Sequence, residues 1–302
     1  MIFKTNQDVL DWYEKQPRAL TPEFISEIPW HEVKDHSFDK KFVPVLIYMR
    51  DIEILTDMYH QELLHTPTGK DKVIGRFMER WGVEEITHGE LINRFLNEAG
   101  IDTPETWKAD VMESVSRSYH FYARALTLMT NCVGKSFTAA HMAYGTINEL
   151  SAAQSYRRLI EMADHPVLTH ILKGIVREES VHTHFYRSVA RLELEKSDYA
   201  QKIARFVVEK FWNPVGSGVR SKDITDYTIA MLFGDEPGIE WIDQAVTSKV
   251  QSLPGFSGLS KVTEKIAKIG RDARARGLLR PNAEKALIGL ALLVLNFDGV
   301  FV

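Results

Sequence analysis

The chain has 302 residues, of which 44% are hydrophobic and 26% charged, with a formal net charge of −4. This is the composition of an ordinary soluble globular protein, and the mildly acidic balance argues against a general nucleic-acid binder, which would be basic. The one cysteine, Cys132, excludes an intrachain disulfide and fits a reducing compartment.

No segment predicts a signal peptide or a membrane span. The N-terminal residues lack an apolar signal core. The longest apolar run, residues 286–295, has about ten residues, whereas a bilayer span needs roughly 20. We therefore expect a cytoplasmic protein with no membrane partner and no nucleic-acid partner.

Apolar residues recur at spacings of three and four along most of the chain, which predicts helices throughout. The stretch Thr66-Pro67-Thr68-Gly69 separates two long helices, and Thr103-Pro104 is expected to supply an N-cap and a first helical residue. The predicted helices cover about 5–15, 22–29, 39–65, 70–99, 104–118, 134–163, 166–194, 197–212, 222–233, 238–250, 258–276 and 282–296.

Four of these helices are much longer than the others, and no linker or low-complexity segment divides the chain. The simplest architecture is one all-α domain over residues 1–302. In this interpretation a four-helix bundle covers about 39–195, and accessory helices from 1–38 and 196–302 pack around it.

Two motifs of the form E-E-x-x-H stand in the second and fourth long helices. They are Glu84-Glu85-Ile86-Thr87-His88 and Glu178-Glu179-Ser180-Val181-His182. Residues three apart share a helix face, so in each motif the second Glu and the His continue an apolar stripe. A buried carboxylate costs several kcal/mol unless it is paired or ligated. Two such interruptions at mid-helix therefore predict a shared metal site.

Further carboxylates lie in the other two long helices. In the third, Glu149 interrupts an apolar row; in the first, spacing does not choose among Asp51, Glu53, Asp57 and Glu62. The ferritin-like di-metal pattern asks for one Glu from each of two helices and Glu-x-x-His from each of the other two. Four carboxylates balance two divalent cations, and mixed carboxylate–imidazole ligation suits iron(II) or manganese rather than structural zinc. A single Glu-x-x-His is more often a surface pair, but two at mid-stripe are hard to explain that way.

With these residues placed, the chain resembles the soluble acyl-(acyl carrier protein) desaturase family of ferritin-like di-iron proteins. The resemblance covers roughly residues 40–250 and is strongest at Arg80–Leu91 and Glu178–Arg187, with a further likeness at Asn148–Ala152. Glu53, followed six residues later by Tyr59, matches the family's first ligand and is thereby selected over its neighbours.

The resemblance implies a ligand set for two iron ions, with manganese as an alternative. The ligands are Glu53, Glu85, His88, Glu149, Glu179 and His182. Glu178 is expected to support a ligand or a nearby tryptophan, and Trp30 is a candidate for the electron route. The family's threonine three residues after the third-helix Glu is replaced here by Ala152. His141, about two turns before Glu149, is an alternative extra ligand.

The activity that the resemblance implies is oxygen-dependent desaturation of a fatty acyl chain. The expected partners are acyl carrier protein or another acyl carrier, a ferredoxin-like electron donor, and a second copy of the chain in a homodimer. Three alternatives stay open: a di-iron oxygenase of a small-molecule pathway, a non-enzymatic iron-binding or ferroxidase protein, and a family member that has lost turnover.

Overall fold

The computed structural model describes residues 3–115, 130–131, 133–134 and 136–293, and this part of the chain contains helices and no β-strand. The elements are α1 (Asn6–Glu14), α2 (Pro22–Ser26), η1 (Trp30–Asp35), η2 (Lys40–Phe42), α3 (Val43–Leu63), α4 (Lys72–Glu98), α5 (Trp107–Glu113), α7 (Ser136–Ala163), α8 (Pro166–Glu195), α9 (Asp198–Phe211), α10 (Lys222–Phe233), α11 (Glu236–Ile242), η3 (Asp243–Thr247), α12 (Ser248–Gln251), α13 (Lys261–Ala275) and α14 (Ala283–Leu293).

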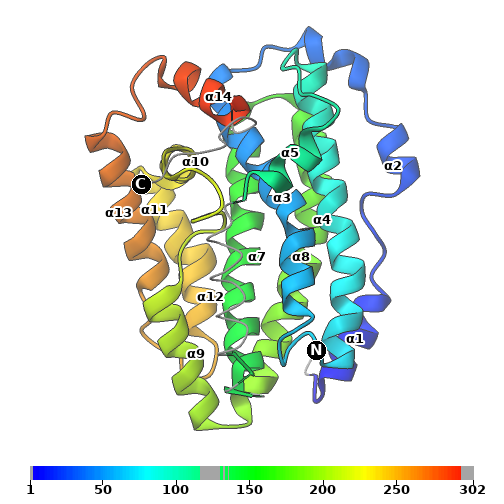
Figure 1. Ribbon diagram of the computed structural model, residues 1–302, viewed down its shortest axis with the longest axis vertical. Coiled ribbons are helices and arrows are strands. Elements are labelled where there is room, and N and C mark those ends of the chain that lie inside the picture. Colours follow the sequence, from blue (N-terminus) through cyan, green and yellow to red (C-terminus); the bar gives the residue numbers. More distant parts are fainter. Residues whose placement is uncertain (1–2, 116–129, 132, 135, 294–302) are drawn as a thin grey trace.

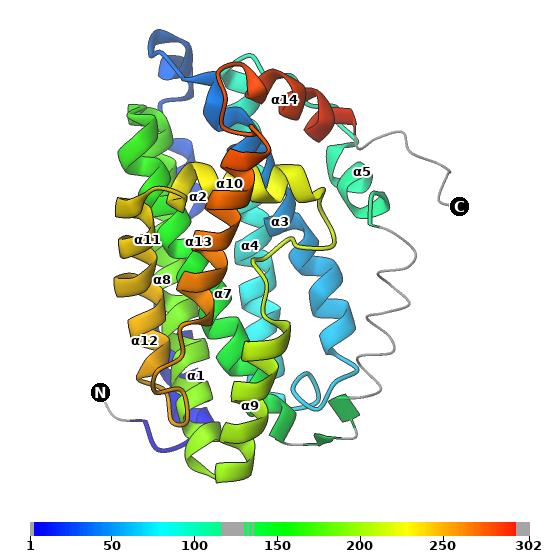
Figure 2. The same cartoon turned by 90° about the vertical axis from the view of Figure 1, so that its left-hand side faces the viewer.

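The four long helices α3, α4, α7 and α8 form the central bundle (Figure 1). Within it, α3 packs against α4, and α7 packs against α8. The accessory helices lie on two sides: α1 contacts α4 and α8, whereas α9 contacts α7 on the side where α10 to α13 gather (Figures 1 and 2). The expected all-α, ferritin-like bundle is confirmed.

Local signals set where the motif-bearing helices begin. Asp71 caps α4, because its side chain accepts hydrogen bonds from the amides of Val73 and Ile74. His165 caps α8 through the Leu168 amide, and Pro166 occupies the first turn, where its missing N–H is not needed. These two starts fix the positions along the bundle at which the two motifs lie.

Several predicted boundaries are wrong. The first long helix begins at Val43 rather than near 39, because Lys40–Phe42 forms a separate 3-10 turn. The helix expected over 104–118 begins only at Trp107. The N-cap position is Thr106 rather than Thr103, and the Thr103 hydroxyl donates to side-chain oxygens of Asn93 at 3.0 Å and Asn97 at 2.9 Å. The last residues of this predicted helix, 116–118, lie outside the described part of the chain. The same holds for residue 135 in the helix predicted over 134–163 and for residues 294–296 in the one predicted over 282–296.

The accessory helices also differ in detail from the prediction. Among them, α2 ends at Ser26 rather than near 29. The stretch predicted as one helix over 238–250 is divided by a π-helical segment, Asp243–Thr247. In the described part of the chain, every helix is too short or too polar to cross a lipid bilayer.

An aromatic layer fills the bundle interior on one side of its polar centre. The rings of Phe77 and Phe185 stack with centroids 3.7 Å apart, and Trp81 and Tyr186 meet edge to face at 6.0 Å. Tyr186 fits against α7 only because residue 145 is glycine. A Cβ there would lie 2.4 Å from two Tyr186 ring carbons.

Gly145→Ala should therefore lower the free energy of unfolding, although alanine is the better helix former. Overpacking a close core contact typically costs about 1–3 kcal/mol, which outweighs the roughly 1 kcal/mol gained in helix propensity. Gly75→Ala in α4 is the matched control, because its Cβ would meet only an ordinary contact at 3.5 Å. Urea denaturation should show opposite signs for the two variants. Equal stabilisation by both would contradict the packing described for Tyr186.

Candidate metal centre

The four bundle helices bring six buried acidic and imidazole side chains into one layer. Their exposed fractions run from 0% to 7%, and they are Glu53 of α3, Glu85 and His88 of α4, Glu149 of α7, and Glu179 and His182 of α8. These are the six residues proposed from the sequence, and the fold places all of them together.

The six side chains form two overlapping groups, each with potential ligand atoms within 4.8 Å of one another. One group is Glu53, Glu85, His88 and Glu179; the other is Glu85, Glu149, Glu179 and His182. Glu85 and Glu179 belong to both groups. The arrangement is that of two adjacent metal positions, with two shared carboxylates between them and one Glu and one His at each end.

Both imidazoles turn Nδ1 towards this layer. His182 Nδ1 lies 2.9 Å from Glu85 Oε1 and 3.7 Å from Glu149 Oε2. His88 Nδ1 lies 3.4 Å from Glu179 Oε1 and 3.9 Å from Glu53 Oε2. Each Nδ1 is thus aimed at the space that the carboxylates surround.

The inward atoms fit metal ions by their chemistry as well as by their positions. Five of them are buried without a hydrogen-bond partner: Glu85 Oε1, both carboxylate oxygens of Glu179, and Nδ1 of His88 and His182. An unsatisfied buried polar atom costs about 1–3 kcal/mol, so several in one place call for a ligand. Mixed oxygen and imidazole donors suit a redox-active first-row metal such as iron.

The pKa values of the layer also indicate a site for cations. Burial, together with the charges of Glu53 and Glu179, raises the pKa of Glu85 well above its usual range. Burial and the Glu179 charge do the same to the pKa of Glu149. For His88, burial opposes the charged form, but the hydrogen bond with Glu178 and the nearby Glu179 and Glu53 carboxylates raise its pKa to about 10. Protons are therefore held where cations would otherwise sit.

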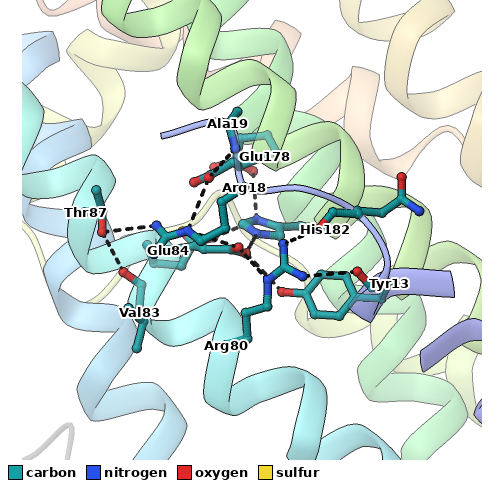
Figure 3. A network of polar contacts seen from close by, with 12 residues as sticks. Tyr13, Arg18, Ala19, Arg80, Val83, Glu84, Thr87, Glu178 and His182 are labelled. Carbon is teal, nitrogen blue, oxygen red and sulfur yellow. Dashed lines mark hydrogen bonds and ion pairs between the residues drawn. The ribbon is translucent and has the colours of Figure 1, made fainter. Parts of the chain in front are cut away.

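The first Glu of each motif holds the His of the other motif. Nε2 of His88 lies 3.1 Å from Glu178 Oε2, and Nε2 of His182 lies 2.8 Å from Glu84 Oε2 (Figure 3). With Nε2–H donated to a carboxylate, Nδ1 is left as the metal-binding nitrogen. Such outer partners fix the tautomer and the ring orientation of a ligating histidine.

These outer carboxylates are themselves well supported. Glu84 accepts hydrogen bonds from the Tyr13 hydroxyl at 3.0 Å and from Arg80 at 2.8 Å. Burial alone would raise the pKa of Glu84, but His182 and Arg80 hold it at about 2. Glu178 is held by His88 and by two backbone amides, and its pKa is likewise lowered. Both groups are thus ionised acceptors at neutral pH.

The other residues proposed from the sequence lie outside the two groups. Ala152 is partly buried on α7, three residues after Glu149, and packs on the hydrophobic core. Trp30 lies in η1 under the guanidinium of Arg94, 4.1 Å from its ring centroid. His141 is not in either group; its Nε2 is 2.7 Å from the Tyr59 hydroxyl. An electron route through Trp30 stays a prediction.

Sequence reasoning missed several supporting residues. Glu84 had a signal, since both motifs begin with two acids, and the residue before a ligand points about 100° around the helix towards a neighbour. For Tyr156 the sequence indicates a core residue or a hydrogen-bonding support for a ligand, but it does not identify Glu53, which accepts from the Tyr156 hydroxyl. Arg80 also had a signal, because it stands four residues before Glu84 on the same helix. Tyr13 and Arg18 had none, because no spacing rule connects the N-terminal segment with α4 and α8.

Comparison with known proteins agrees with this geometry. A family model described as fatty acid desaturase matches residues 53–215, more than half of the chain. The matched stretch begins at Glu53 and contains all six side chains of the layer. No curated protein and no solved structure matched the chain.

Shared and terminal ligands should differ in their effect on metal content. Glu179→Ala should remove nearly all bound metal, because that carboxylate belongs to both groups, whereas His182→Ala should leave about one ion per chain. Elemental analysis after dialysis measures this. Glu98→Ala, which breaks an exposed pair with Arg94, is the control and should keep the wild-type content. Full metal content in both site variants would refute the ligand set.

Metal binding should stabilise the protein more as pH rises. The pKa of His88 is raised from 6.5 to about 10, so its protonation stabilises the metal-free fold below pH 6.5, and this contribution is lost as pH rises towards 10. Bound metal requires neutral His88 and so competes with that proton. The difference in Tm between metal-loaded and metal-free protein should therefore widen from pH 6.5 to 9 in calorimetry. A constant difference would count against metal binding at His88.

Proposed function

This chain belongs to the fatty acid desaturase family, and we propose that it is an oxygen-dependent di-iron oxidoreductase that introduces a double bond into a carrier-bound fatty acyl chain. The observation that carries the proposal is the pair of four-residue groups sharing Glu85 and Glu179 at the buried centre of the bundle. A family match over residues 53–215 supports the reaction class.

The reaction balances with one oxygen molecule and two external electrons. Two C–H bonds on adjacent carbons break, and the substrate gives up two protons and two electrons to oxygen. Two further electrons come from a ferredoxin-like donor and two protons from solvent. The products are one carbon–carbon double bond and two molecules of water.

The chain's own residues hold, orient and shield the centre. When bound, iron supplies the reduction and activation of oxygen, which no amino-acid side chain performs. Glu84 and Glu178 keep His182 and His88 oriented through Nε2. All six inward side chains are buried, so the bundle limits access of bulk water to the reacting groups.

The carrier, the electron donor and the homodimer belong to the proposal too. An acyl carrier protein is acidic, and α13 exposes Lys268, Arg271 and Arg274 on one segment of the surface. Opposite charges would steer the two proteins together. The same chemistry suits an acidic ferredoxin-like donor, and the family resemblance supports a dimer.

A second candidate is a di-iron oxygenase of a small-molecule pathway. Two observations favour it: Ala152 stands where the family has a threonine, and His141 of α7, two turns before Glu149, pairs with Tyr59 of α3. The two candidates differ in product. A desaturase removes two hydrogens, whereas an oxygenase adds an oxygen atom.

The assay that tests the function uses iron(II)-loaded protein, reduced ferredoxin, oxygen and a panel of acyl-carrier substrates of increasing chain length. We expect one chain-length class to lose 2 mass units in mass spectrometry, since two hydrogens are removed. His182→Ala, which removes a proposed ligand, should lose this product. A gain of 16 mass units would favour the oxygenase, and no change in any substrate would end the desaturase proposal.

A further inference from the structure

The segment Tyr13–Leu20, here called the N-terminal strap, runs from the end of α1 across the outer side of α4 and α8 (Figure 3). The match to the fatty acid desaturase model begins only at residue 53, so the strap lies outside the matched region. It nevertheless contacts both outer carboxylates of the metal layer.

Hydrogen bonds tie the strap to α4 at one end and α8 at the other. The Tyr13 hydroxyl donates to Glu84, while Arg80 donates to the carbonyls of Tyr13 at 3.2 Å and Gln16 at 3.0 Å. The amides of Ala19 and Leu20 donate to Glu178 Oε1 at 2.9 and 3.0 Å. The strap therefore completes the environment of both carboxylates that hold the ligand imidazoles.

Arg18 occupies the place between those two carboxylates. Its Nε lies 3.5 Å from Glu84 Oε1 and 3.5 Å from Glu178 Oε1, and its terminal nitrogen reaches the Thr87 hydroxyl at 3.4 Å. The Arg18 side chain is 33% exposed, whereas the two carboxylates are at most 3% exposed. One guanidinium thus faces two buried negative charges from the solvent side.

The charges of the layer explain why a cation is needed there. Six carboxylates are buried together: Glu53, Glu84, Glu85, Glu149, Glu178 and Glu179. Two divalent ions offset four negative charges, and two remain when the histidines are neutral. Among the described residues, the guanidinium groups of Arg80 and Arg18 are the two cations that contact the outer carboxylates. With them, the loaded centre is electrically neutral.

We propose that Arg18 is a positioning residue of the metal centre, and that the strap acts through Glu84 and Glu178 to hold His182 and His88 in their metal-binding orientation. Arg18 touches neither a metal position nor a substrate; it acts by neutralising and fixing the two carboxylates. This inference rests on the metal-binding part of the proposed function.

The test measures cobalt(II) binding under anaerobic conditions to the full-length wild type, Arg18→Gln and Arg18→Lys. Arg18→Gln removes the charge and should weaken affinity by about 10- to 100-fold, as loss of an outer partner does at other metal sites. Arg18→Lys keeps the charge and should recover most of that loss. The cobalt(II) visible spectrum should shift in Arg18→Gln, because the imidazole orientation changes.

Arg191→Gln is the matched control. Arg191 is also 33% exposed, pairs with Glu195 at 2.8 Å and bonds to the backbone of Phe3, so it anchors the N-terminal segment to α8 without contacting the metal layer. Its affinity and spectrum should equal those of the wild type. Thermal melts of the metal-free variants separate a folding defect from a binding defect.

Two results would overturn the proposal. One is wild-type affinity and spectrum in Arg18→Gln. The other is an equal loss in Arg18→Gln, Arg18→Lys and Arg191→Gln, which would assign the strap a role in stability alone. Failure of the wild type to bind cobalt(II) at all would instead refute the metal centre itself. The two failures are therefore distinguishable before any activity is measured.

Discussion

The structure depends on one electrostatic constraint: six carboxylates are buried together in a helical bundle, four in the metal layer and two directly outside it. Two like charges 4 Å apart repel by about 4 kcal/mol even at an effective dielectric constant of 20. Without cations, such a layer must take up protons, and the raised pKa values of Glu85, Glu149 and His88 report this. The bundle is therefore organised to hold positive charge at its centre, and the neighbouring elements are arranged around that requirement.

The repeated motif meets this requirement with a two-fold division of roles. In each copy the second Glu is shared between the metal positions, the His closes one end, and the first Glu supports the opposite His. The partners of the two outer carboxylates do not follow this two-fold arrangement. Glu84 is held by side chains of Tyr13 and Arg80, whereas Glu178 is held by backbone amides of the strap. The two equivalent histidines thus rest on chemically different supports.

The sequence predicts the features that depend on periodic or repeated residues. It does not predict contacts between residues that are far apart along the chain. The helices and the second Glu and His of each motif follow from 3–4 spacing, but Glu53 was separated from Asp51 and Asp57 only by family resemblance. The predicted cap at Thr103 is wrong because the helix begins only at Trp107, and side chains of α4 hold Thr103 ahead of it. The strap could not be predicted, since its contacts join residues more than 60 positions apart.

The two sides of the metal layer contribute different groups to the centre. Glu84, Glu178 and the strap fill the side of the centre at α4 and α8 and engage both histidines at Nε2. The opposite side lies between α3 and α7, the helices that supply the terminal carboxylates Glu53 and Glu149. On that side the Tyr156 hydroxyl of α7 donates to Glu53 of α3. The α4–α8 side therefore orients the two histidines, whereas the α3–α7 side supplies the carboxylate at each end of the layer.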